Sequence, residues 1–224
     1  MIPWPWQVIP RAAQWTIVGA SRSGGRSITG AEQVVRSDAG YWRARFLIEF
    51  FGEENILAWR AFVASLDGRM GEVEVPTFDL YTRHDINGRR LNFYDAAHLA
   101  GASIFDHSGF GQEQLVQATL ASSADIRATQ ITVDAQTSWQ APRPGSHFSI
   151  GNRLHRVIGA WRETQSDPWS VRFRPGLRAP AEAGAIVITD RTKCLMRLAD
   201  DDMADPELDL GYRGEVEVDF VEAI

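Results

Sequence analysis

Residues 41–50 read Tyr-Trp-Arg-Ala-Arg-Phe-Leu-Ile-Glu-Phe, the most regular stretch of the chain. Side chains along a β-strand point alternately to its two faces, so this alternation predicts a strand with one buried face. The predicted buried face consists of Trp42, Ala44, Phe46, Ile48 and Phe50. The opposite face is mixed, which is typical of an antiparallel sheet that has one wetter side.

A single helix is predicted directly after this strand. Glu53 and Glu54 fall in its first turn, where the helix dipole favours negative charge. Gly68 suits the left-handed position that ends a helix. One stripe of the predicted helix surface consists of Ile56, Trp59, Val63 and Leu66. Because these residues are three or four positions apart, we expect them to pack in the core.

The flanking segments predict further strands of the same N-terminal unit. Strands are expected at 14–19, 31–36 and 70–75. Residues 20–27 are expected to be a flexible loop in which Gly24 and Gly25 are able to take positive φ. In the last strand, at 215–220, acidic residues alternate with apolar ones. Its acidic face is typical of an edge strand that resists association, and we expect the strand to pair with the N-terminal sheet.

The middle of the chain predicts a separate small β unit. Short strands recur about every ten residues, separated by Gly and Pro turns, which favours a small barrel or sandwich. These strands are expected at 115–120, 129–133, 147–150, 153–158, 169–173 and 185–189. Gly151-Asn152 is a pair suited to a hairpin turn. The predicted fold is therefore mainly β with one α-helix. A β-sandwich-like domain at 1–112, completed by a returning strand at 191–224, holds an inserted β-barrel or sandwich domain at 113–190.

Composition excludes several classes of protein. The chain has 224 residues and a formal net charge of −6, which argues against a general nucleic-acid binder. No stretch approaches the length of a membrane helix, and the first residues do not predict a secretory signal. Cys194 is the only cysteine, so no disulfide can form within the chain, and a buried thiol is expected. Lys193 is the only lysine, which excludes a P-loop.

Catalytic and metal-binding patterns were also not found. No two histidines have the spacing of His-Glu-x-x-His, and there is no Cys-x-x-Cys pair. The acidic stretch at 200–209 lacks the glycine of a calcium loop, so a solvated loop is expected. Residues 21–26 are glycine-rich but do not follow the dinucleotide-binding pattern. We therefore predict no catalytic residue, no cofactor and no metal, and a protein that is not an enzyme.

The candidate functional residues are those suited to contacts between subunits. Trp4 and Trp6 flank Pro5, and tryptophan is enriched at the centre of interfaces. This pair is expected either to dock on a neighbour or to fold back onto its own core. Arg22 and Arg26, in the glycine-rich segment, are expected to meet acidic groups of a partner.

Residues 83–112 form a long stretch of little periodicity. Long loops of this kind inside a compact domain are usually functional or disordered. Three of its aromatic residues, Phe93, Tyr94 and Phe105, are predicted to pack against a neighbouring subunit.

Several segments together resemble tail proteins of long-tailed bacteriophages and prophages of proteobacteria. They are Thr29-Gly30-x-Glu32-Gln33, Gly40-Tyr41-Trp42-Arg43-Ala44, Trp59-Arg60-Ala61-Phe62, Leu66-Asp67-Gly68-Arg69-x-Gly71, the hairpin at 144–157, Cys194-x-Met196-Arg197-Leu198 and Phe220-Val221-Glu222-Ala223. The resemblance covers nearly the whole chain, and its motifs are structural. Ser146 stands where these proteins more often have Asp.

In size and layout the chain is most similar to the distal tail proteins of that group. The resemblance implies a belt domain with one helix, a β-rich appendage, and a hexameric ring between the tail tube and the tail tip. DNA would pass through the lumen without specific binding, and an acidic chain suits such a conduit. The implied partners are copies of itself, a tail tube protein and a tail-tip or hub protein, with no membrane. The implied location is the virion, after synthesis in the bacterial cytoplasm.

Two alternatives remain open. The first is another tail or neck protein, such as a terminator or minor tail protein. The second is a carbohydrate-binding β-module that uses exposed aromatic side chains as stacking platforms. Trp139 and Trp161 lie in predicted loops and suit that role, whereas Trp169 alternates with apolar residues and is expected in the core.

Overall fold

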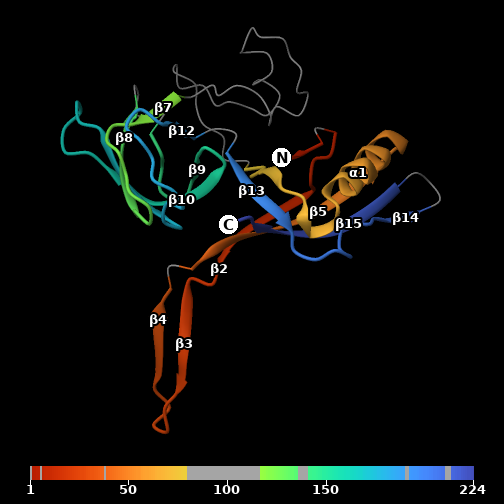
Figure 1. The fold of residues 1–224 in the computed structure, drawn as a ribbon, viewed down its shortest axis with the longest axis horizontal. Coiled ribbons are helices and arrows are strands. Elements are labelled where there is room, and N and C mark those ends of the chain that lie inside the picture. Colours follow the sequence, from red (N-terminus) through yellow and green to blue (C-terminus); the bar gives the residue numbers. More distant parts are fainter. Residues whose placement is uncertain are drawn as a thin grey trace.

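The computed structural model describes residues 2–5, 7–37, 39–79, 117–135, 141–189, 192–209 and 213–224. A twisted sheet with a helix on one face lies beside a small closed barrel, and a long hairpin extends away from both (Figure 1). The described residues are mainly β, with α1 as their one α-helix. The predicted fold class is therefore confirmed.

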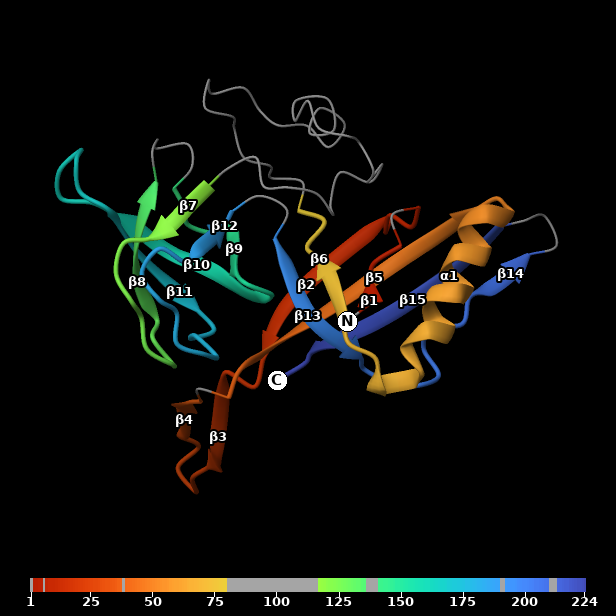
Figure 2. The same ribbon diagram turned by 45° about the horizontal axis from the view of Figure 1, so that its top comes forward.

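The large sheet contains seven strands from both ends of the chain. Along the sheet these are β1 (Ile2–Pro3), β6 (Val73–Pro76), β13 (Lys193–Leu198), β15 (Arg213–Glu222), β5 (Tyr41–Phe51) and β2 (Ala12–Val18), with β14 (Glu207–Asp209) paired to β15. Strand β5 is antiparallel to both of its neighbours. The C-terminal strand thus lies beside the N-terminal strands, as Figure 2 also shows.

One face of β5 forms the centre of the core. The five apolar residues predicted to face inward are at most 1% exposed. Helix α1 (Glu53–Leu66) packs against this face, with Trp59 fully buried and its Nε1 donating to Ala204 O at 2.8 Å. Phe62 is also buried, whereas Val63 of the predicted stripe is only half-buried. The predicted span of the helix is therefore correct. Its predicted buried face is wrong at one position, because Phe62 is buried where Val63 was expected.

The other face of β5 meets the acidic residues of β15. Strand β15 lies between β13 and β5, so the interpretation of its acidic face as protection for a sheet edge was wrong. Arg45 Nε lies 2.9 Å from Asp219 Oδ1, and Arg43 pairs with the same carboxylate. Burial alone would raise the pKa of Asp219, but the hydrogen bonds and charges of the two arginines outweigh it and lower that pKa.

Strands of the middle segment close into a six-stranded barrel. In order around the barrel they are β10 (Arg153–Trp161), β11 (Trp169–Arg174), β8 (Gln130–Ala135), β7 (Gln117–Leu120), β12 (Ile186–Ile188) and β9 (His147–Ile150). All six correspond to predicted strands, and β9 turns into β10 at the expected Gly151-Asn152 pair. The expected domain boundaries, 112/113 and 190/191, lie outside the described residues.

The glycine-rich segment is a strand rather than the flexible loop that was expected. Strands β3 (Ser21–Arg26) and β4 (Glu32–Arg36) form a two-stranded hairpin that projects from the body. Sequence reasoning missed β3 because Ser and Gly have low β propensity, and here pairing to β4 decides the conformation. Gly25 has φ 87°, whereas Gly24 does not take positive φ.

Close packing explains one glycine of the Leu66–Gly71 motif. A Cβ at Gly71 would lie 2.6 Å from Leu66 Cα, so the backbone could not keep its place. We predict that Gly71→Ala lowers the free energy of unfolding by about 2 kcal/mol or more, by forcing these two backbone segments apart. Urea denaturation monitored by tryptophan fluorescence measures this loss.

Gly24→Ala is the matched control for this substitution. A Cβ there would find its nearest neighbour, Gln33 O, at 3.5 Å, an ordinary contact. Its effect should stay within about 0.5 kcal/mol. Equal stability of the two variants would contradict the packing argument.

Candidate subunit-contact site

The barrel is joined to the sheet at the beginning of β5. Trp42 lies in the core of the sheet, and its Nε1 donates to Leu154 O of barrel strand β10 at 2.7 Å. The side chain of Leu154 points the other way from the barrel core and is buried with the residues of the sheet. Leu195 N of β13 donates to Asn152 O at 2.9 Å. These contacts give the two units a shared apolar seam in which Trp42 Nε1 and Leu195 N both have hydrogen-bond acceptors.

A buried carboxylate reinforces this seam. The side chain of Glu222, at the end of β15, is 1% exposed and accepts a hydrogen bond from Trp42 N at 3.1 Å. Arg178 Nη2 lies 3.2 Å from Glu222 Oε2, and Arg153 Nη1 lies 3.8 Å from Oε1. Arg178 also donates to Gly40 O, and Arg153 to Ala223 O. The buried negative charge thus has two cationic partners from the barrel side.

A second polar chain crosses the same junction. The Arg156 guanidinium lies 5.0 Å from the centroid of the Trp42 ring and donates to Trp15 O at 3.1 Å. Its Nε also donates to His147 Nε2, and His147 Nδ1 donates to Asp79 Oδ2, each at 3.1 Å. Burial lowers the pKa of Arg156, and the charge of Asp79 acts in the opposite direction. Cation–π contacts of partly desolvated arginine contribute about 1 kcal/mol.

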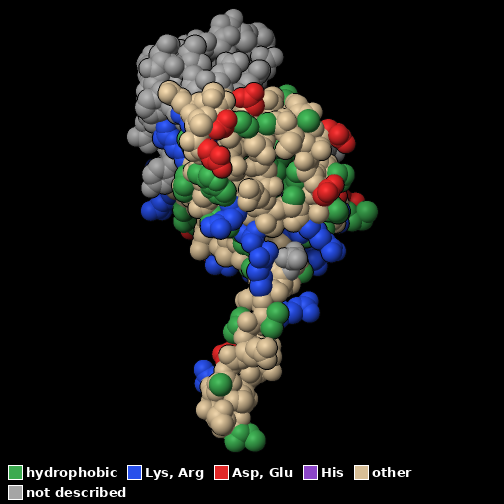
Figure 3. Space-filling model, turned by 90° about the vertical axis from the view of Figure 1, so that its left-hand side faces the viewer, with side chains coloured by type: hydrophobic (Ala, Val, Ile, Leu, Met, Phe, Trp, Pro, Cys, Tyr) green, Lys and Arg blue, Asp and Glu red, His purple; other side chains and the backbone are tan. Residues whose placement is uncertain are grey.

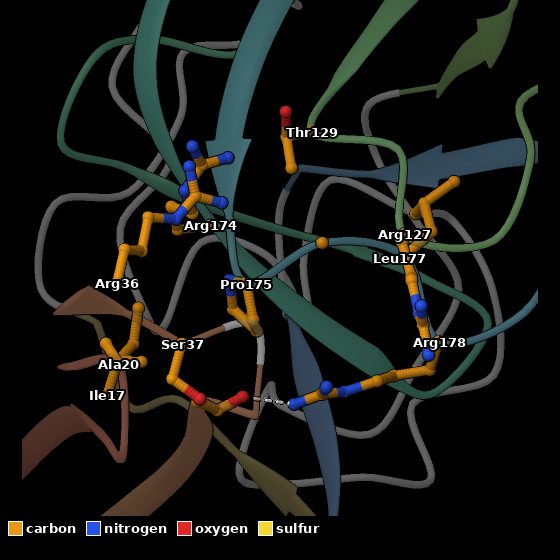
Figure 4. Close-up of a pocket in the computed structure, with 12 residues that line it drawn as sticks. Ile17, Ala20, Arg36, Ser37, Arg127, Thr129, Arg174, Pro175, Leu177 and Arg178 are labelled. Atoms are coloured by element: carbon orange, nitrogen blue, oxygen red, sulfur yellow. Dashed lines mark hydrogen bonds between the residues drawn. The ribbon is translucent and has the colours of Figure 1, made fainter. Parts of the chain in front are cut away.

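A cleft lies between the barrel and the base of the hairpin (Figure 4). We call it the arginine cleft because Arg36, Arg127, Arg174 and Arg178 line it, and no acidic residue is among the described residues of its lining. Its volume is about 230 Å³. Figure 3 shows basic side chains gathered where the hairpin leaves the body. Of these four arginines, Arg178 is the one that also pairs with the buried Glu222 carboxylate.

The hairpin is exposed along its whole length. Every side chain of β3 and β4 is exposed, including Val34 at 60% and Val35 at 56%, and Ile28 at the tip is fully exposed. Ser23 Oγ donates to Glu32 Oε1 at 2.6 Å across the two strands. An isolated two-stranded hairpin is marginally stable in water. Its apolar residues on both faces favour burial against another surface.

The predicted interface residues have different surroundings. Trp4 packs on Phe46 and Phe78 at 5.6 and 5.4 Å between ring centroids, and its Nε1 donates to Val8 O. It folds back onto its own core, the second of the two interpretations left open. Arg22 and Arg26 lie on β3, where Arg26 Nε is 4.0 Å from Glu32 Oε2 of the same hairpin. The other predicted residues, Trp6, Phe93, Tyr94 and Phe105, lie outside the described residues.

His155 is buried in the barrel, away from His147. It pairs with Phe148 in the β9–β10 hairpin, whereas His147 pairs with Arg156, so the two imidazoles point to opposite faces. His155 Nδ1 donates to Pro175 O at 2.9 Å, and Nε2 has no hydrogen-bond partner among the described residues. Burial lowers the pKa of His155 to about 4, although the bond to Pro175 acts in the opposite direction. Burial likewise raises the pKa of the Cys194 thiol, which is buried as predicted.

Sequence reasoning missed the residues of the junction and of the cleft. The segment at 174–176 was recognised only as a turn, and Glu222 only as part of a C-terminal motif. The spacing of these residues carries no signal, because Gly40, Arg178 and Glu222 meet only after the two units pack.

Among the described residues, no group of three His, Cys, Asp or Glu side chains lies close enough to hold a metal ion. No helix in the described ranges is both long and apolar enough to span a membrane. No protein-family model matches the sequence, and no curated protein does.

The buried carboxylate yields a direct prediction. Glu222→Gln should lower the free energy of unfolding by about 2–4 kcal/mol, because Arg153 and Arg178 lose the charge that compensates theirs. Glu217→Gln is the control, since the side chain of Glu217 is 57% exposed and its loss should cost less than about 1 kcal/mol. Guanidinium denaturation of both variants tests this, and similar losses would show that burial does not strengthen the Glu222 pair.

His155 predicts how stability changes with acidity. Its folded pKa is lower than the unfolded value of 6.5, so its contribution is complete above pH 6.5 and declines as the pH falls towards about 4. The total decline is about 3 kcal/mol. His155→Phe should lose correspondingly less stability over that interval than the parent chain. Parallel pH–stability curves of the two proteins would contradict the assigned pKa.

Proposed function

We propose that this protein is a structural component of the tail of a long-tailed bacteriophage or prophage. Its proposed place is that of a distal tail protein, a subunit of a ring between the tail tube and the tail tip. The segments quoted above resemble such proteins, and the confirmed fold class agrees with that resemblance. The proposed work is mechanical and requires no bond to be made or broken.

The observation that carries this proposal is the exposed hairpin of β3 and β4. It extends beyond the body, and its valines and Ile28 contact no other part of the described core. In a ring, each subunit offers two different surfaces, one to each neighbour, and the rotation between copies closes the assembly. A rigid body with one projecting arm suits such a contact, because the arm can reach the next copy.

The firm connection between the sheet and the barrel also suits a subunit that has to withstand mechanical force. The Glu222 network and the shared packing of Trp42 and Leu154 hold the barrel against the sheet, so the two units would move together. The further proposed partners are a tail tube protein and a tail-tip or hub protein, in the virion. Passage of DNA through the lumen would be helped by the net charge of −6, since like charge disfavours phosphate contacts.

The alternative of a carbohydrate-binding module has less support. Trp161, at the end of β10, is 44% exposed and could stack on a sugar ring. Trp169 packs against the barrel core, and the Arg162 guanidinium covers its ring at 4.7 Å. Trp139 lies outside the described residues. One exposed aromatic ring supports the module less well than the hairpin supports assembly.

We expect the full chain to assemble into closed rings of about six copies, visible by negative-stain microscopy and mass photometry. Val34→Ser with Val35→Ser should weaken assembly about tenfold or more, because each buried valine contributes about 1.5 kcal/mol and 1.4 kcal/mol is tenfold. The melting temperature should not change, since both residues are exposed.

Leu57→Ser, on the 51%-exposed Leu57 of α1, is the control and should leave assembly unchanged. A chain that stays monomeric at high concentration and binds glycans through Trp161 would contradict the proposal and favour the module.

A further inference from the structure

The exposed ring of Trp161 lies flat on the outer face of the barrel. Side chains two residues apart on a strand share a face, so Trp161 stands next to the empty position of Gly159. A Cβ added at Gly159 would have Trp161 Cζ3 as its nearest neighbour, at 3.9 Å. The ring therefore leans back along β10 over Gly159 instead of projecting away from the sheet. Because 44% of Trp161 remains exposed, the outer side of this ring is available for contact.

The neighbours of Trp161 on the same face of the barrel are polar. Trp161 pairs with Ser170 of β11, which pairs with Thr132 of β8. In the next row, Gly159 pairs with Arg172, which pairs with Gln130. These two rows form what we call the tryptophan platform: Trp161, Ser170, Thr132, Gly159, Arg172 and Gln130. The platform crosses three strands and is therefore roughly 10 Å wide.

The loop that follows Trp161 borders the platform and is held by its own hydrogen bonds. Thr164 N donates to Asp167 Oδ2, and Arg162 Nη1 donates to Gln165 O, each at 2.9 Å. The same Arg162 covers the ring of Trp169, the residue before Ser170. Groups that are already ordered lose less conformational freedom when a ligand binds. The polar border of the platform is therefore preorganised.

The platform is separate from the seam and from the hairpin. Leu154, which packs with the core of the sheet, lies near the start of β10, and Trp161 is its last residue. The seven residues of strand between them correspond to roughly 20 Å. In Figure 1 strand β8 lies on the side of the barrel away from the sheet. None of the seam and hairpin contacts given above uses a platform residue, so a ligand here would not compete with them.

The chemistry of the platform fits a carbohydrate. A pyranose ring offers a face of C–H groups that can pack on an indole, and its hydroxyls lie at the rim, where polar side chains can bind them. An apolar protein surface would instead leave those polar side chains without partners. Arg172 is the one charged member of the platform, and the exposed Asp134 follows Thr132 on the same face of β8. This balance of charge favours a neutral sugar over single-stranded nucleic acid, which requires a positively charged groove.

We propose that the tryptophan platform binds neutral β-linked oligosaccharides of gluco configuration. One pyranose ring stacks on Trp161, and the hydroxyls of that ring and of the next sugar bind Ser170 and Arg172. The ring hydroxyls of such sugars are equatorial, so each ring face is a flat surface of C–H groups. The site goes beyond the proposed role in assembly and does not depend on it. With one stacking ring, the dissociation constant should be about 1 mM.

Saturation-transfer NMR of the full chain with cellohexaose or chitohexaose tests the proposal. Transfer should be strongest to the axial hydrogens of one ring face, because that face lies on the indole. Trp161→Ala should weaken binding about tenfold or more, since stacking on an aromatic ring is lost. Trp161→Phe, which keeps a smaller flat ring, should retain part of the binding. Gly159→Val should also weaken it about tenfold, because its methyl groups would lift the indole off the strand.

The control is Ile186→Ser, on the 50%-exposed Ile186 of barrel strand β12. It should bind both sugars like the parent chain, and circular dichroism should show all variants folded.

Three results would overturn the inference. The first is the absence of transfer to both sugars at concentrations well above about 1 mM. The second is equal binding by the parent chain and Trp161→Ala, which would place the sugar elsewhere. The third is tighter binding of single-stranded oligothymidylate than of either sugar, which would make the platform a nucleic-acid site. Ring formation is measured separately, so none of these results decides the proposed role in assembly.

Discussion

Strand β5 must bury five apolar side chains on one face, and this requirement places most of the molecule. Helix α1 packs over that face, and β2 and β15 pair along its two edges. Trp42, the first of the five, also donates to the barrel through Leu154 O. A strand with such a face cannot stay in water, so the body forms around it. Both the barrel and the hairpin are attached to the sheet near the first residues of β5.

Two buried carboxylates of this protein each lie beside two arginines. Asp219 is buried under Arg43 and Arg45, and Glu222 under Arg153 and Arg178, so these carboxylates are neutralised where water is excluded. Breaking such a pair is costly because it leaves an uncompensated charge behind.

The hairpin and the junction differ in how many contacts hold them in place. The junction is held by a shared core and by contacts of one carboxylate with two strands and with the segment after β11, which favours a rigid body. The hairpin has only its own two strands, with a bulge between Ser23 and Arg26. Local stability follows the number of buried apolar contacts, so the hairpin belongs to the least stable part of the described chain. An arm of this kind gains stability when a neighbouring surface buries its exposed apolar residues.

Local pattern was enough to predict the elements that bury their own periodic face. The alternation at 41–50, the helix at Glu53–Leu66 and the six barrel strands were all found from the spacing of apolar residues and from turn residues. Strand β3 was missed because Ser and Gly carry no such pattern, and the acidic strand β15 was misjudged as an edge because spacing does not reveal neighbours.

The candidate contact site could not be predicted from the sequence for the same reason. Glu222 meets Trp42 across 180 residues, and the cleft combines arginines from β4 with others from the barrel. The amino-acid sequence by itself determined which faces are apolar and where the chain turns, since these depend on neighbours a few residues apart. Only the tertiary structure decided which charges face each other, because that depends on how separate strands come into register.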